Sequence, residues 1–238
     1  MRLITRDTDV FIASYPKSGN TWVRFIIANL IQPQQAITFR NIDEVVPDVH
    51  KLRGDLDRFR SPRTIKSHAP DFGTFPRYIY VYRDGRDALA SWYRYVTDKG
   101  RFHGTFSEFL RTRGRDTFAG HWHEHVARAA LHAVSHPGRA LFVSYESLLM
   151  STRNCVHDIV AFLPLEVGDD EIDAAIAKTD LASLREMEKK FGPETPGKLI
   201  EFFREGRSGA WRDVFAEDDV EYFTGMAGET LRLLGYAL

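Results

Sequence analysis

Short apolar runs recur along the chain, with stretches of helical pattern between them. Tyr78–Tyr82 (YIYVY) is the clearest run, because aromatic and β-branched residues favour strands. The first run is short and apolar and ends at Pro16, as a buried strand does. The pattern predicts strands at Val10–Ser14, Arg63–Lys66, Tyr78–Tyr82 and Ala140–Ser144.

Most of the remaining chain has the apolar spacing of helices. After the first run, apolar residues fall at positions 22, 23, 25, 26, 27, 30 and 31. Asp84 is a plausible N-cap for a later helix. Residues 32–63 contain three prolines and predict loops with one or two short helices. The predicted helices are Ser18–Ile31, Asp84–Thr97, Thr105–Thr112, Thr117–Ser135, Ser151–Phe162, Asp169–Lys178, Asp180–Lys190 and Glu217–Leu234.

Strands that alternate with helices predict an α/β fold, with three αβα layers around a central, mostly parallel sheet. The sequence contains no internal repeat or long linker, so we expect residues 1–238 to form a single domain. Ligands of such sheets bind beyond the carboxyl ends of the strands. The segments that follow the predicted strands are therefore expected to converge on one crevice.

Composition excludes a few classes of protein. A net charge of −1 provides no overall basic footprint for nucleic acid. The sequence has no run of 18 apolar residues, and Arg6, Asp7 and Asp9 interrupt what would be the apolar core of a signal peptide. The single Cys155 excludes an intrachain disulfide and fits a reducing compartment. We therefore expect a cytoplasmic protein without stable membrane insertion.

The segment Pro16–Thr21 (PKSGNT) joins the first predicted strand to the first predicted helix. A helix N-terminus binds anions through unpaired N–H groups and its dipole. Lys17 adds a positive charge, and Gly19 lets the backbone approach a ligand closely. The nucleotide P-loop needs G-x-x-x-x-G-K-[ST], whereas here the lysine precedes the glycine and no glycine lies upstream. A phosphate-sized anion site is favoured over a triphosphate site, and a purely structural turn is the alternative.

Two further segments carry candidate chemistry. Arg83 at a strand end and Ser91 about two helical turns along can grip a phosphate from two sides, although Arg83 equally suits a surface ion pair with Asp84 or Asp87. Lys66 and His68 point to the same side of an extended chain. A histidine with an ordinary pKa of about 6.5 accepts a proton near neutral pH.

A pair of histidines four residues apart also suggests a metal site. His121 and His125 flank Glu124 in a pattern like His-Glu-x-x-His. The glutamate stands in the wrong order for that motif, and no third ligand is identifiable, so we predict no metal.

These segments together resemble the sulfotransferases that use 3′-phosphoadenosine 5′-phosphosulfate (PAPS). Tyr15–Trp22 (YPKSGNTW) is similar to the family's 5′-phosphosulfate loop, with Asn20 in place of the family's threonine. Arg83 and Ser91 have the spacing of its 3′-phosphate motif, and Lys66-x-His68 resembles its Lys-x-His segment. The resemblance runs from about residue 10 to residue 215 and implies a P-loop NTPase-like fold.

The resemblance also implies residue roles. It makes His68, Lys17 and Lys66 catalytic, with His68 as the general base. Trp122 and His125, from a segment similar to the family's Gly-x-Trp-x-x-His-Val, would line the acceptor pocket. The residues implied to bind the donor are Lys17, Ser18, Gly19, Asn20, Thr21, Trp22, Arg83, Ser91, Tyr145, Arg204, Glu205 and Gly206.

Three further positions depart from the family's pattern. Glu205 stands where the family has lysine, and Ala210 stands where it has aspartate. Leu184 replaces an aromatic residue, which leaves Trp22 as the expected stacking platform for the adenine. The family's dimer segment is not reproduced, so the oligomeric state stays open.

The predicted reaction moves a sulfonate group from PAPS to a hydroxyl or amine of a small-molecule acceptor by in-line displacement, and leaves 3′,5′-adenosine bisphosphate (PAP). The acceptor pocket is expected from residues 32–60, 102–122 and 191–202, whose aromatic rings suit apolar acceptors and core packing equally well. One alternative is a P-loop-type nucleotide or small-molecule kinase, and another is a non-catalytic nucleotide-binding module.

Overall fold

The fold is described from a computed structural model, which covers residues 4–52, 56–112, 119–194, 202–204 and 206–238. Within these residues the strands form one parallel sheet in the order β2-β1-β3-β4. Val10 pairs in register with Thr64 on one side and Arg77 on the other. The four predicted strands are thereby confirmed, with bounds β1 Val10–Ser14, β2 Thr64–Ser67, β3 Arg77–Tyr82 and β4 Ala140–Ser144.

The helices mostly follow the predicted pattern. Asp84 caps its helix as expected, because its side chain accepts a hydrogen bond from the backbone N–H of Arg86. The short helix that directly follows β4 was not predicted. The helix expected from Thr117 begins at Trp122, and Thr117 itself lies outside the described residues. The helices are α1 Asn20–Ile31, α2 Ile42–Val45, α3 Gly85–Asp98, α4 Phe106–Thr112, α5 Trp122–Ser135, α6 Tyr145–Met150, α7 Thr152–Phe162, α8 Asp169–Lys178, α9 Leu181–Phe191 and α10 Glu217–Leu233, with short 3-10 turns at Leu56–Arg58, Phe72–Thr74 and Ala210–Asp213.

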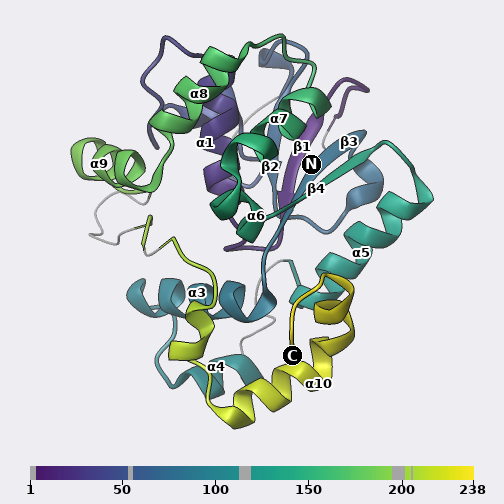
Figure 1. Ribbon diagram of the computed structural model, residues 1–238, viewed down its shortest axis with the longest axis vertical. Coiled ribbons are helices and arrows are strands. Elements are labelled where there is room, and N and C mark those ends of the chain that lie inside the picture. Colours follow the sequence, from purple (N-terminus) through teal and green to yellow (C-terminus); the bar gives the residue numbers. More distant parts are fainter. Residues whose placement is uncertain (1–3, 53–55, 113–118, 195–201, 205) are drawn as a thin grey trace.

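Apolar side chains cover both faces of the sheet. Val10 and Ile12 point to one face, where the core includes residues of α1 and α7. Phe11 and Ala13 point to the other face, where the core includes residues of α3, α4, α5 and α10. Figure 1 shows the strands between these two groups of helices, which confirms the predicted αβα layers.

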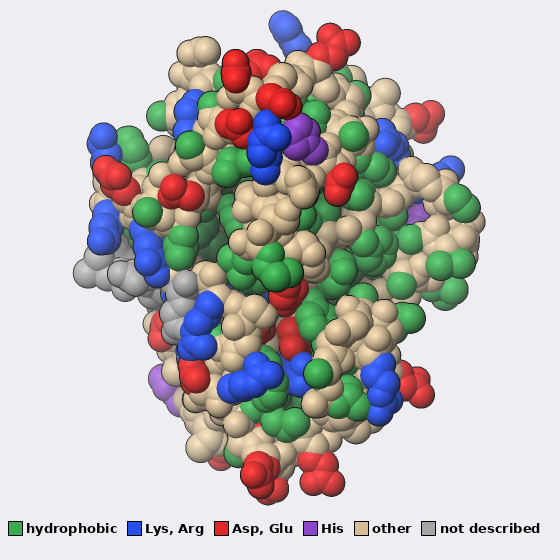
Figure 2. Space-filling view, viewed as in Figure 1, with side chains coloured by type: hydrophobic (Ala, Val, Ile, Leu, Met, Phe, Trp, Pro, Cys, Tyr) green, Lys and Arg blue, Asp and Glu red, His purple; other side chains and the backbone are tan. Residues whose placement is uncertain are grey.

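Parallel strands place the loops that follow them at one edge of the sheet. The segment before α1, the residues after β2, and the starts of α3 and α6 therefore meet there. Basic and acidic side chains are interspersed over the face seen in Figure 2, in keeping with the net charge of −1. No helix among the described residues is long and apolar enough to cross a bilayer.

Candidate functional site

A cavity of about 390 Å³ opens at the carboxyl edge of the sheet. It receives side chains from the segments after all four strands, so the predicted convergence is confirmed. Ser18, in the loop itself, is buried and does not line the cavity, and Glu205 lies outside the described residues. The predicted site residues that line the cavity are Lys17, Gly19, Asn20, Thr21, Trp22, Lys66, His68, Arg83, Ser91, Tyr145, Arg204 and Gly206.

The loop before α1 has a backbone shape that depends on its glycine. Gly19 has a φ of 101°, and a Cβ there would lie 2.7 Å from Cδ2 of Tyr145. Lys17 also adopts a positive φ, of 66°, which turns the backbone sharply in front of the helix. The buried hydroxyl of Ser18 has no hydrogen-bond partner among the described residues. A loop of this shape, at a helix N-terminus and with an unpaired buried donor, fits an anion.

Lys17 places an ammonium group with a lowered pKa in this cavity. Its pKa is lowered to about 8, chiefly by burial, while Glu194 raises the pKa and the nearby Arg204 and Arg83 lower it. Its Nζ lies 4.6 Å from the ring centroid of Tyr95 and also contacts the Phe202 ring. An anion bound beside this ammonium favours its charged form and therefore raises its pKa.

Arg83 lies between β3 and α3, with part of its guanidinium available to a ligand. Its Nη2 donates to the backbone oxygen of Arg207 at 2.9 Å and lies 3.6 Å from the Asp87 carboxylate. Its buried Nε has no hydrogen-bond partner among the described residues. Both interpretations of the sequence are thus realised, since Arg83 pairs with Asp87 and also lines the cavity with the half-buried Ser91. Buried N–H groups without acceptors fit a phosphate.

Two aromatic rings form a wall suited to a nucleotide base. The rings of Trp22 and Tyr145 meet edge to face, with centroids 6.0 Å apart, and Trp22 Nε1 donates to the backbone oxygen of Thr179 at 2.9 Å. The Arg83 guanidinium lies 4.3 Å from the Tyr145 ring centroid. Leu184 is buried and lines the same cavity.

Arg204 and Gly206 are among the last residues along the chain that line the cavity. Arg204 forms an ion pair with Asp98 on α3. Gly206 has a φ of 63°, and a Cβ there would lie 2.7 Å from Cδ2 of Leu181. The sequence pattern did not reveal that Asp87 braces this segment, by accepting from the backbone N–H groups of Gly209 and Trp211 at 2.8 Å each.

The Asn20 side chain ties two strands together. Its Nδ2 donates to the backbone oxygen of Ile12 at 3.0 Å and to Ser14 Oγ at 3.1 Å, and it approaches the backbone oxygen of Ser67 at 3.4 Å. These acceptors belong to β1 and β2. Asn20 is thus bound mainly to the sheet, although it also lines the cavity.

We expect Asn20→Ala to lower the free energy of unfolding by about 1–3 kcal/mol, because buried acceptors of both strands lose their donor. Urea unfolding followed by tryptophan fluorescence measures this difference. Asn154→Ala, at an exposed position of α7, is the control and should change stability little. Equal stability of the two variants would remove this role from Asn20.

His68 is oriented by Ser14, a residue that the sequence pattern did not reveal. The Nδ1 atom of His68 lies 2.9 Å from the Ser14 backbone oxygen and 3.1 Å from its hydroxyl. A carbonyl oxygen only accepts, so Nδ1 carries the proton and Nε2 carries the lone pair. Burial, and next the charge of Lys66, lower the pKa of His68 well below its usual value. The imidazole is therefore neutral and basic at Nε2 near neutral pH.

The structure does not bring the two predicted acceptor-pocket residues to the cavity. Trp122 is 2% exposed and packs against Phe223, close to Gly85. His125 is fully buried, with Nδ1 2.8 Å from the Tyr80 hydroxyl and Nε2 3.2 Å from the backbone oxygen of His68. His125 therefore contacts the backbone of His68 from within the core, without reaching the cavity itself.

Of the aromatic residues expected to form the acceptor pocket, Phe202 lines the cavity, whereas four others pack elsewhere. Phe39, Phe59, Phe102 and Phe106 belong to or pack against the hydrophobic clusters and do not line the cavity, because their positions face the sheet and neighbouring helices. Phe118 lies outside the described residues.

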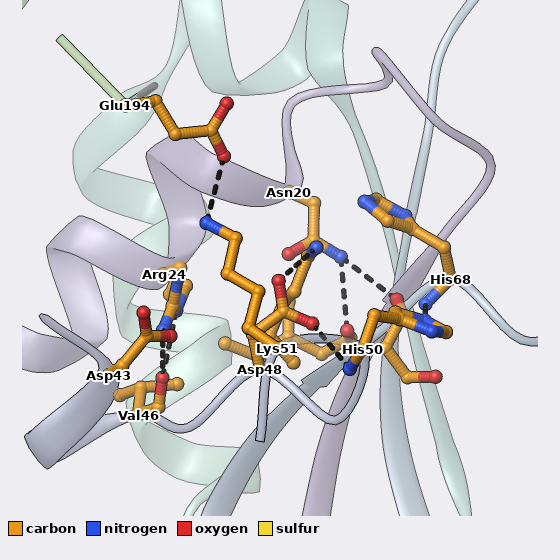
Figure 3. A network of polar contacts seen from close by, with 12 residues as sticks. Asn20, Arg24, Asp43, Val46, Asp48, His50, Lys51, His68 and Glu194 are labelled. Carbon is orange, nitrogen blue, oxygen red and sulfur yellow. Dashed lines mark hydrogen bonds and ion pairs between the residues drawn. The ribbon is translucent and has the colours of Figure 1, made fainter. Parts of the chain in front are cut away.

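Polar side chains occupy the space beside His68. Asp48, His50, Lys51 and Glu194 line the cavity there. Figure 3 shows Lys51 reaching across to Glu194, where the two charged groups lie 3.2 Å apart. The described residues contain no group of three or more His, Cys, Asp or Glu side chains suited to a metal ion.

Comparisons with known proteins agree with this geometry. The family described as "Sulfotransferase domain" matches residues 7–235. Sulfotransferase 2B1 of Mus musculus is 28% identical over 247 residues, which cover 95% of this chain and 72% of the relative. Cytosolic sulfotransferase 13 of Arabidopsis thaliana is 28% identical over 236 residues, covering 87% of this chain and 72% of the relative.

A solved structure has a similar fold. Mouse sulfotransferase SULT7A1, crystallised in complex with PAP, superposes on this chain with a TM-score of 0.75. The two are 24% identical, and the superposition covers 97% of this chain and 86% of the other. This likeness extends the P-loop-like αβα architecture across nearly the whole chain.

Proposed function

The chain belongs to the sulfotransferase domain family and is a PAPS-dependent sulfotransferase, and from that premise we propose how its cavity carries out the transfer. The sulfonate group of PAPS passes to a hydroxyl, or an amine, of a small-molecule acceptor, with His68 as the general base. The observation that carries this proposal is the convergence of Lys17, Lys66 and His68 on one cavity whose loop fits a phosphate. Residues 1–238 are proposed to act as a single cytoplasmic domain.

The donor is proposed to lie across the carboxyl edge of the sheet. The loop amides before α1, Ser18 and Lys17 hold the 5′-phosphosulfate. Arg83, from the turn before α3, and Ser91, on α3, hold the 3′-phosphate, and the buried Nε of Arg83 has no partner among the described residues.

The remaining donor contacts come from both sides of the cavity. Trp22 and Tyr145 form the wall against which the adenine packs, since the leucine at 184 supplies no ring. Arg204 and Gly206 form the opposite side of the cavity. Arg204 is held there by its ion pair with Asp98, and Gly206 by the tight turn of its backbone.

The transfer is proposed to proceed in line. His68 Nε2 takes the proton of the acceptor hydroxyl as the acceptor oxygen bonds to sulfur and the bond from sulfur to the bridging phosphate oxygen breaks. Negative charge then grows on that bridging oxygen, which leaves with PAP. Lys17 and Lys66 stabilise this charge, and such stabilisation counts most in the transition state.

The acceptor is proposed to enter beside His68, Lys51 and Glu194. The side chains there are polar or charged, and Phe39, Phe59, Phe102 and Phe106 lie in or against the core, although Phe202 lines the cavity next to Lys17. We therefore propose a small acceptor that carries polar groups near the hydroxyl or amine that accepts the sulfonate.

Transfer from PAPS in the presence of excess chelator tests the proposal. Purified protein is incubated with PAPS and a panel of alcohols, phenols, amines and sugars, and PAP release is measured beside a parallel reaction with ATP and Mg²⁺. We expect PAP release with PAPS and none of the corresponding product with ATP. Activity only with ATP and Mg²⁺ would identify a kinase, and tight PAP binding without transfer to any acceptor would favour a binding module.

A further inference from the structure

The segment Pro47–Val49 runs beside β2 at the edge of the sheet. The backbone N–H of Lys66 donates to the Pro47 oxygen at 2.8 Å, and the N–H of Val49 donates to the Lys66 oxygen at 3.1 Å. These bonds make a parallel bridge that pairs Asp48 with Lys66. The position of Asp48 next to Lys66 is therefore fixed by the backbone of the sheet.

Asp48 and Lys66 form a buried ion pair. Asp48 Oδ2 lies 2.7 Å from Lys66 Nζ, and the residues are 2% and 8% exposed. Asp48 Oδ1 accepts a hydrogen bond from the backbone N–H of His50 at 3.0 Å, so both carboxylate oxygens have partners. Figure 3 shows Asp48 and His50 next to each other, close to Asn20. Removing one charge of such a pair leaves the other buried without compensation.

The groups around Lys66 pull its pKa in opposite directions. Burial lowers the pKa most, and Arg24 on α1 lowers it further, whereas Asp48 and Glu194 raise it. His68 and His50 are the titratable histidines on this side. Burial alone would raise the pKa of Asp48, but Lys66, together with the backbone N–H of His50 and with Arg24, keeps this pKa below its usual value. Asp48 therefore remains a carboxylate, and it is the group that most favours the charged form of Lys66.

We propose that Asp48 is a positioning residue for the transfer reaction, which holds Lys66 as a charged ammonium at the wall of the cavity. The inference rests on the proposed function, because it assigns to Lys66 the growing charge on the leaving phosphate oxygen. A neutral Lys66 amine would supply no net charge there, and an unanchored one would leave the cavity wall. Asp48 itself touches neither the donor nor the acceptor in this scheme.

Asp48→Asn tests the inference, since asparagine has nearly the same shape without the charge. Nuclear magnetic resonance of isotope-labelled lysine side chains follows the titration of Lys66, assigned by loss of its signal in Lys66→Gln. We expect the pKa of Lys66 to fall by about 1–2 units in Asp48→Asn, as for loss of an adjacent opposite charge. We also expect kcat to fall by at least ~10-fold, as for a displaced catalytic group. An unchanged Lys66 titration would overturn the inference.

Three further variants separate this role from a general loss of structure. Asp48→Glu keeps the charge and should leave the pKa of Lys66 close to its original value, even if the fold tolerates Asp48→Asn poorly. Glu44→Gln, at an exposed position of the nearby helix α2, should change neither quantity. In a Lys66→Gln background, Asp48→Asn should cost no further activity, and a full additional ~10-fold loss would contradict action through Lys66.

The titration needs no catalysis, so it also separates this inference from the proposed function. A wild-type protein that transfers nothing from PAPS would refute the proposed function, while the effect of Asp48 on Lys66 would still be measured. A protein that transfers sulfonate but shows no dependence of Lys66 on Asp48 would refute only the inference.

Discussion

Replacement of His68 by alanine is expected to lower kcat by at least ~100-fold while PAP still binds. The structure provides the reason, because Nδ1 of His68 is committed to Ser14 and the lone pair is left on Nε2. In the proposed scheme this lone pair on Nε2 takes the proton of the acceptor, and alanine has no group that could replace it. PAPS-dependent turnover and equilibrium binding of PAP measure the two quantities separately.

His68→Asn separates the base from the positioning of the loop. The asparagine amide can still donate to Ser14 but accepts no proton, so it should lose activity as severely as His68→Ala. His103→Ala, at an exposed position outside the cavity lining, should keep full activity. Turnover of either His68 variant near the wild-type value would remove His68 from the mechanism.

The pH dependence provides a second check on His68. A general base acts in its deprotonated form, so activity rises as pH passes upward through its pKa. Because burial and Lys66 lower that pKa, the acidic limb of the rate profile should lie below the ordinary histidine value of about 6.5. A limb above that value would mean that another group supplies the base.

The sheet and the phosphate loop could be predicted because local sequence determines them. An apolar run followed by PKSGNT fixes a strand, a turn and a helix N-terminus within a few residues. The carboxyl edge of parallel strands then gathers Lys17, Lys66, His68 and Arg83 without any further information.

The contacts that the sequence did not predict depend on pairings between distant parts of the chain. Asp48 reaches Lys66 only because Pro47–Val49 adds to the edge of β2, and the proline-containing stretch from 32 to 63 carries no local sign of that pairing. The orientation of His68 likewise depends on Ser14 in the neighbouring strand.

Aromatic residues misled the prediction of the acceptor side for a related reason. Trp122 and His125 were expected at the pocket because their segment resembles the family's Gly-x-Trp-x-x-His-Val, but their helix packs against the sheet and buries both. Sequence identifies a ring without saying which face of a helix it occupies. The polar lining beside His68 therefore emerges only from the packed structure.

Replacement of Lys17 by methionine is expected to lower kcat/KM for PAPS by about 100- to 1,000-fold, as for loss of a main donor to the developing charge. Methionine keeps an unbranched apolar chain against the Tyr95 and Phe202 rings, so the substitution removes mainly the charge. Initial rates at varied PAPS concentration measure the effect. Lys189→Met, at an exposed position of α9, is the matched control and should be unchanged.

The pH profile connects this loss to the charge of Lys17. In the donor-free enzyme its pKa is lowered to about 8, chiefly by burial. The ammonium is the form that binds the phosphosulfate, so kcat/KM for PAPS should be highest below this pKa and should fall as pH rises through about 8. Bound donor raises the pKa again, and the corresponding fall in kcat should lie at higher pH. Lys17→Met should lack the limb near pH 8. If the variant kept this limb and wild-type kinetics, other cations of the cavity would have to stabilise the negative charge on the leaving group.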